Sequence, residues 1–178
     1  KGRPGASIAV DAQGLVDDEQ LSSLDLSDGF VSLQMANNET GVVQDLTRQC
    51  QRLRAAGAAV IHSDGAQGVF RLPLQLAELD LDCMTFTAHK SFGPAGVGVI
   101  YLRQGCIIDP LLVGGSQERG VWPGTENLLT IVGMGVLAEL ASEVDLWPRA
   151  ELQAKQVELA QKLLSIPHCQ IFSLVDFE

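Results

Sequence analysis

Residues 81–102 read Leu81-Asp82-Cys83-Met84-Thr85-Phe86-Thr87-Ala88-His89-Lys90-Ser91-Phe92-Gly93-Pro94-Ala95-Gly96-Val97-Gly98-Val99-Ile100-Tyr101-Leu102. Apolar segments at 81–86 and 99–102 predict two buried strands, joined by a polar segment and a glycine-rich turn. The joining segment carries Lys90. Burying an ammonium is costly, and desolvation lowers the basicity of lysine, as an amine that attacks a carbonyl requires. Lys90 is therefore either such a nucleophile or a strand-end lysine whose charge reaches water.

Strand and helix patterns alternate on the amino-terminal side of this stretch. The predicted elements are strands over residues 30–35, 58–62, 81–86 and 99–102 and helices over residues 44–56 and 74–79. A strand, a helix of about a dozen residues and another strand is the βαβ rhythm of a mostly parallel sheet. The sequence therefore predicts an α/β fold.

The two ends of the chain differ from the middle. At most one short strand is expected near the start, at residues 7–10. Helices are predicted over 127–141 and 148–164, and the second begins at Pro148, a residue favoured in the first turn of a helix. A last short strand is expected at 169–172.

Composition narrows the class of protein. The chain has 178 residues, 46% of them apolar, with a net charge of −10. That negative charge argues against a nucleic-acid partner, because proteins that bind nucleic acid carry a basic face. Four cysteines without CxxC spacing indicate a reducing, cytoplasmic location and no metal site. The longest apolar run, residues 128–138, is too short to cross a bilayer, so no membrane partner is expected.

Polar residues follow the predicted strands where a parallel sheet gathers its ligands. Asn37, Asn38, Asp64 and Lys90 all fall after strands, at the carboxyl edge of the predicted sheet. A carboxylate at Asp64 could keep a heteroaromatic nitrogen protonated and make the ring an electron sink. It could equally be a turn-forming aspartate before Gly65.

Three further features could bind a ligand. Asn38 could bind a ring oxygen or form a turn. His89 could contact a phosphate or a ring, or be an ordinary half-buried histidine. The segment 114–119 could be a phosphate loop, although a lone glycine pair is weak support.

Five segments, in this order and spacing, carry a resemblance to a known family. They are Met35-Ala36-Asn37-Asn38-Glu39-Thr40-Gly41, His62-Ser63-Asp64-Gly65-Ala66-Gln67, Thr87-Ala88-His89-Lys90-Ser91-Phe92-Gly93-Pro94, Gly114-Gly115-Ser116-Gln117-Glu118-Arg119-Gly120 and Pro123-Gly124-Thr125-Glu126-Asn127. The set resembles the cysteine desulfurases and the related selenocysteine lyases, within the class V aminotransferase-like enzymes that use pyridoxal 5′-phosphate. The similarity covers essentially the whole chain.

The resemblance implies a role for individual residues. Lys90 matches the lysine that binds the cofactor as a Schiff base and moves protons, and Asp64 matches the partner of the pyridinium nitrogen. The remaining cofactor-binding matches are Asn38 and Gln67 at the phenolic oxygen, Thr87 and His89 at the phosphate, and Thr125 at the phosphate of a neighbouring subunit. The implied fold is a partial large domain of fold type I. The implied activity removes sulfur from L-cysteine to give L-alanine and an enzyme persulfide, in a homodimer that serves a sulfur-acceptor protein.

Departures from the family predict an interior portion of a longer enzyme, incomplete at both ends and inactive alone. Residues 1–141 match the carboxyl-terminal portion of the cofactor-binding large domain, and residues 142–178 match a linking helix and the start of the small domain. The family's ring-stacking histidine, substrate-binding arginine and persulfide cysteine have no counterpart here. Trp122 stands where many relatives have arginine.

Two classes of function stay open on the sequence. The first is the middle of a working desulfurase, with a selenocysteine lyase or another class V lyase or aminotransferase as the alternative activity. The second is a non-catalytic remnant that binds the cofactor or dimerises. The same cofactor-binding residues serve all these enzymes, so Lys90 and Asp64 do not choose among them.

Overall fold

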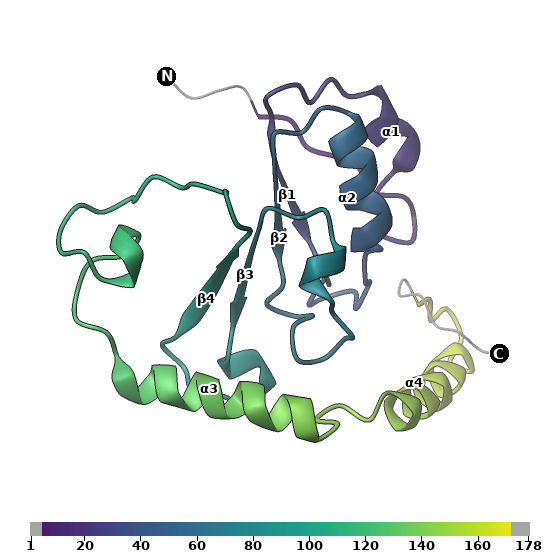
Figure 1. The fold of residues 1–178 in the computed structure, drawn as a ribbon. Coiled ribbons are helices and arrows are strands. Elements are labelled where there is room, and N and C mark those ends of the chain that lie inside the picture. Colours follow the sequence, from purple (N-terminus) through teal and green to yellow (C-terminus); the bar gives the residue numbers. More distant parts are fainter. Residues whose placement is uncertain (1–4, 172–178) are drawn as a thin grey trace.

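A computed structural model describes residues 5–171 as one four-stranded sheet with helices around it (Figure 1). The helices are α1 (Asp18–Ser23), α2 (Leu46–Ala55), α3 (Leu128–Glu143) and α4 (Arg149–Leu164), and the strands are β1 (Phe30–Gln34), β2 (Val60–Asp64), β3 (Cys83–Thr87) and β4 (Gly98–Leu102). Short 3-10 helices lie at η1 (Leu76–Glu78), η2 (His89–Ser91) and η3 (Glu118–Gly120).

The sheet is mixed but mostly parallel. Its strand order is β1-β2-β3-β4, in which β1, β2 and β3 run parallel and β4 pairs antiparallel with β3. The carboxyl ends of the three parallel strands therefore meet at one edge of the sheet. The predicted α/β fold is confirmed, and this edge positions the candidate site.

The core lies on one face of the sheet. β1 alternates exposed and buried residues, and its buried Val31 and Leu33 share a cluster with Ile61 and Met84 of the neighbouring strands. The amphipathic face of α2 covers this cluster with Leu46, Cys50 and Leu53. Side chains of successive strand residues point to opposite faces, so the other face carries Phe30 and its neighbours, and Phe30 is 65% exposed.

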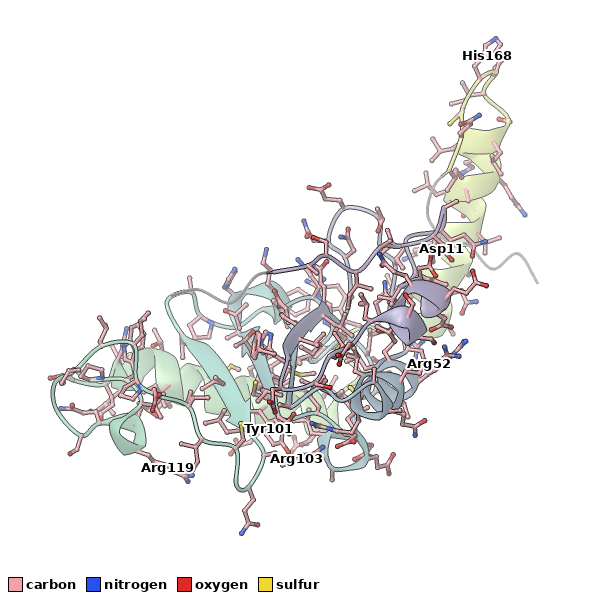
Figure 2. The ribbon with its side chains drawn as sticks, turned by 90° about the horizontal axis from the view of Figure 1, so that it is seen from above. Asp11, Arg52, Tyr101, Arg103, Arg119 and His168 are labelled. Carbon is pink, nitrogen blue, oxygen red and sulfur yellow. The ribbon has the colours of Figure 1, made fainter. Side chains whose placement is uncertain are left out.

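The carboxyl-terminal helices extend past the sheet. In Figure 1, α3 runs beneath the ends of β3 and β4, and α4 continues beyond it. Met134 and Leu137 of α3 pack with Ala88 in a second, smaller core. The loop after β4 that bears Arg119 and the end of α4 near His168 stand at opposite ends of the molecule (Figure 2). No helix within residues 5–171 is long and apolar enough to cross a membrane.

Several predicted element bounds need correction. The strand predicted at 58–62 spans Val60–Asp64, because the backbone of Ser63 and Asp64 pairs with β1 despite their polar side chains. The strand predicted at 81–86 is shifted in the same direction, and only a 3-10 turn forms within 74–79. Residues 7–10 form a single bridge from Val10 to Val16 in place of a strand. Residues 169–171 are irregular, and residue 172 lies outside the described residues.

Candidate functional site

The candidate site begins where β2 and β3 end side by side. Asp64 is the last residue of β2 and is in register with Thr85 of β3. The Gly65 amide donates to the Thr85 carbonyl over 2.8 Å, so the turn after β2 remains tied to β3. β3 ends at Thr87, and η2 with Lys90 follows after one residue. Asp64 and Lys90 thus leave adjacent strands at the same edge.

The Asp64 carboxylate is exposed and only partly used by its own turn. Its Oδ1 accepts the Ala66 amide over 2.9 Å, which is the turn-forming role considered from the sequence. Within residues 5–171, the other carboxylate oxygen accepts no hydrogen bond. Asp64 therefore both shapes its turn and presents a free anionic oxygen.

His62 lies two residues before Asp64 on the same face of β2. Its Nδ1 lies 2.8 Å from the Ser32 hydroxyl and its Nε2 lies 3.1 Å from the Thr85 hydroxyl, so the ring bridges three strands. Phe30 stacks against it, with 6.1 Å between ring centroids. Burial lowers the pKa of His62, and the charge of Asp64 opposes this shift. The neutral ring is therefore favoured beside the carboxylate.

Lys90 is exposed, which corrects the premise that it ends a buried strand. It is the middle residue of η2, one turn beyond β3. Within the part of the chain that the structure describes, nothing buries its side chain, as in the alternative of a lysine whose charge reaches water. What the fold does supply is position, because η2 holds Lys90 at the same edge as Asp64.

Thr87 and His89 form a defined pair beside Lys90. The Thr87 hydroxyl donates its proton to the Val97 carbonyl over 3.0 Å. Its oxygen lies 2.9 Å from His89 Nδ1, so this nitrogen must carry a proton and donate it to Thr87. His89 Nε2 is left for another partner, and the residue is exposed.

Gln67 is joined to the Lys90 turn by an arginine. Arg71 Nη1 donates to Gln67 Oε1 over 2.9 Å, and its Nη2 donates to the Lys90 carbonyl. The Arg71 guanidinium also lies 4.6 Å from the centre of the Trp147 ring. Sequence reasoning missed Arg71 and Trp147. No helical periodicity signals the first contact, because residues 66–71 form turns and not a helix.

The two remaining predicted residues are less closely joined to this edge. Asn38 is exposed in the turn after β1, and its neighbour Asn37 organises that turn by accepting the amides of Glu39 and Thr40. Thr125 is exposed in the loop between β4 and α3, which extends away from the sheet (Figure 1). The structure therefore gathers Asp64, Gln67 and the Thr87–Lys90 segment, but leaves Thr125 in a separate loop.

A cavity of about 470 Å³ lies beside Arg71. Trp147, Arg149, Gln153 and Gln156 are among its other lining residues. Within residues 5–171, no group of three or more histidine, cysteine, aspartate or glutamate residues is placed to hold a metal ion.

The structure is a mixed α/β sheet that carries Asp64 and Lys90 at one edge. The family model described as Aminotransferase class-V matches residues 5–176, and the chain belongs to that family. Enzymes of this family and cysteine desulfurases depend on pyridoxal 5′-phosphate.

Cysteine desulfurases and NifS-like proteins are among the proteins similar to this chain. A cysteine desulfurase of Bradyrhizobium diazoefficiens is 40% identical over 165 residues, which cover 92% of this chain and 42% of the relative. A solved structure of a NifS-like protein from Rickettsia africae superposes with a TM-score of 0.87 at 34% identity, over 95% of this chain and 48% of that one. A structure titled SspA in complex with cysteine matches with a TM-score of 0.73 at 26% identity, over 92% and 47%. The chain thus spans less than half the length of these relatives.

The residues at the edge fit pyridoxal phosphate. They include a lysine amine, a carboxylate with a free oxygen, the side-chain amide of Gln67 and a histidine nitrogen with no partner in the described chain. These groups are suited to a carbonyl, a pyridinium nitrogen, a phenolic oxygen and a phosphate, respectively.

Proposed function

We propose that this chain is the cofactor-binding part of a pyridoxal-phosphate-dependent cysteine desulfurase. In the full-length protein, sulfur would pass from L-cysteine to a receiving cysteine thiol, giving L-alanine and a persulfide. The observation that carries the proposal is the placement of Asp64 at the end of β2 and of Lys90 just beyond the end of the adjacent strand β3. The desulfurase relatives, and the cysteine bound to the structural neighbour SspA, support the choice of substrate.

Each edge residue has a role suited to its position. Lys90 would hold the cofactor covalently through Nζ and would move a proton to and from the substrate carbon. The free oxygen of Asp64 would accept a hydrogen bond from the pyridinium N–H of the cofactor. Bound in this way, pyridoxal phosphate withdraws electrons from the substrate carbon.

The remaining residues orient the cofactor. Gln67 and Asn38 would donate side-chain amide protons to the phenolic oxygen, and Thr87 and His89 would bind the phosphate. The bond from His89 Nδ1 to Thr87 leaves its Nε2 as the nitrogen that would be available to the phosphate.

We further propose a homodimer in which Thr125 reaches the phosphate of the neighbouring subunit. The loop that carries Thr125 is exposed, as are apolar side chains along it, including Ile107, Leu111, Val113 and Trp122. Such apolar exposure is typical of surfaces that another chain covers. Residues 1–141 would then belong to the large domain and residues 142–178 to the linking helix and small domain. The four free cysteines fit a cytoplasmic location, where an acceptor protein would collect the sulfur.

Borohydride reduction tests the cofactor assignment. The full-length protein loaded with pyridoxal phosphate should be reduced, digested and mapped, and the pyridoxyl group should appear on Lys90. Sulfide release from L-cysteine in the presence of a thiol reductant then tests the activity. A label on another lysine, or a Lys90→Ala protein that still releases sulfide, would contradict the proposal.

Mixed dimers test the role of Thr125. A Thr125→Ala protein with Lys90 intact is mixed with a Lys90→Ala protein with Thr125 intact, and the subunits are allowed to exchange. If the site is shared, one site of each mixed dimer carries both defects and the other carries neither, so activity should return. Equilibrated mixed dimers without regained activity would place Thr125 in its own subunit's site.

A further inference from the structure

Arg71 connects two segments that both carry candidate cofactor ligands. Through Nη1 it donates to the side chain of Gln67 over 2.9 Å, and through Nη2 it donates to the backbone carbonyl of Lys90. These acceptors lie on separate segments, one following β2 and the other following β3. A planar guanidinium presents its donors in a rigid fork, so the two contacts hold these segments at a set separation.

The contact from Arg71 also determines which atoms Gln67 presents to a ligand. Arginine has donors only, so the Gln67 atom that faces it must be the carbonyl oxygen. The amide nitrogen then lies on the other side of the side chain, with its protons free of hydrogen bonds within residues 5–171. Gln67 is thereby oriented to donate a hydrogen bond, which is the interaction that an anionic oxygen of a ligand accepts.

The Lys90 turn needs such support because its backbone is strained. Phe92, which ends η2, has φ of +70°, a conformation that residues with a Cβ adopt at a cost. Its ring stacks on Trp147 with 4.9 Å between centroids, and Arg71 lies over the same indole. The Ser91 hydroxyl also donates to the Val69 carbonyl over 3.4 Å. Arg71 and Trp147 are therefore the centre of a set of contacts that holds the turn.

We propose that Arg71 is a positioning residue that orients the Gln67 amide and fixes the Lys90 turn for cofactor binding. This inference rests on the proposed function, because it assumes that Gln67 and Lys90 bind pyridoxal phosphate. Arg71 itself need not touch the cofactor. Its half-buried guanidinium acts through the two segments that it joins.

Substitution of Arg71 with a matched control tests this role in the full-length protein. Arg71→Met keeps most of the aliphatic stem and removes both hydrogen bonds. Arg149→Met removes a guanidinium that lines the same cavity but contacts neither Gln67 nor Lys90. The equilibrium affinity of each apoprotein for pyridoxal phosphate is measured by absorbance, and backbone hydrogen exchange is followed at residues 89–93.

The expected result is a rise of about tenfold in the dissociation constant of Arg71→Met, as for the loss of one hydrogen bond to a charged donor. Exchange at residues 89–93 should quicken in Arg71→Met, and Arg149→Met should match the parent in both measurements. Arg71→Lys keeps the charge but not the fork, so its affinity should be intermediate. It also keeps the test decisive if Arg71→Met does not fold.

A double-mutant cycle with Gln67→Ala separates positioning from general structural support. If Arg71 acts partly by orienting Gln67, Arg71→Met should weaken binding less in the Gln67→Ala protein than in the parent. Fully additive losses would overturn the orienting role, and unchanged affinity in Arg71→Met and Arg71→Lys would overturn the inference as a whole. A parent protein that does not bind pyridoxal phosphate would instead contradict the proposed function.

Discussion

The two edges of the sheet use their polar side chains in opposite ways. At the amino edge, Arg54 bonds Asp82 over 2.7 Å and Asp80 over 3.2 Å, and Arg103 bonds Asp80 over 2.8 Å. At the carboxyl edge, Asp64 keeps a free oxygen and Lys90 has no side-chain partner within residues 5–171. The first edge pairs its charges with one another, whereas the second leaves them for a ligand. Charges at the amino edge should therefore set stability, and charges at the carboxyl edge should set chemistry.

Substitution of Asp64 should have the largest effect on turnover. It tests most directly whether charges at the carboxyl edge serve chemistry and not stability. Asp64→Asn can keep the acceptor for the Ala66 amide but removes the negative charge. Turnover of the loaded full-length protein should fall by about a hundredfold or more, since the carboxylate no longer stabilises a protonated ring. The free energy of unfolding should change by about 0.5 kcal/mol or less.

Asp64→Ala serves as the matched comparison because it removes the charge and the turn contact together. It should lose about as much activity as Asp64→Asn and also about 1 kcal/mol of stability. Near-normal turnover in Asp64→Asn would show that Asp64 is only a turn residue.

Arg54→Met probes the opposite edge. It leaves Asp82, whose side chain is 16% exposed, without its arginine, so urea denaturation should show a loss of about 2 kcal/mol. Arg48→Met is the control, because the Arg48 side chain is 56% exposed in its pair with Asp18 and should cost about 0.5 kcal/mol or less. Cofactor affinity should be unchanged in both. Equal losses of unfolding free energy in the two variants would contradict the larger contribution to stability expected of the amino-edge ion pairs.

Phe92 tests whether the carboxyl edge stores backbone strain. Phe92→Ala and Phe92→Gly both remove the stack on Trp147 and differ only in the Cβ atom. At φ of +70° the glycine variant should be more stable than the alanine variant by about 1 kcal/mol, measured by thermal unfolding. Alanine at least as stable as glycine would mean that the turn is not strained.

His62 should give the smallest effect, and it depends on pH. Its folded-state pKa is lowered by burial, so the unfolded chain binds more protons as the pH falls below 6.5. The contribution of neutral His62 to stability is therefore complete above pH 6.5 and is lost as the pH falls through its folded-state pKa. His62→Gln should flatten the stability profile in this window, as urea titrations at several pH values would show. An unaltered profile would assign the pH dependence to other groups.

The sequence predicted the sheet better than it predicted the contacts around it. Apolar periodicity located all four strands, because burial of one face of the sheet imposes that pattern. The end of β2 was misplaced because its last two residues are polar. Asp64 and Lys90 were brought to one edge as the βαβ rhythm requires. The sequence left the exposure of Lys90 undecided, since burial of its side chain depends on what packs over η2. The contacts of Arg71 with the Lys90 carbonyl and Trp147 join segments distant in sequence, which periodicity does not encode. The roles of the seven site residues remain predictions.

The antiparallel pairing of β4 has a consequence for how the chain folds. Thr87 of β3 pairs with Gly98 of β4, and Phe30 of β1 pairs with Val60 of β2. The segment of chain between the first pair is much shorter than the segment between the second. Closing the shorter loop loses less conformational entropy, so the β3–β4 hairpin can form before the parallel strands assemble. The segment enclosed by that hairpin contains Lys90. The loop that contains Lys90 would therefore form early in folding. Asp64 would reach its position later, when β2 pairs with β3.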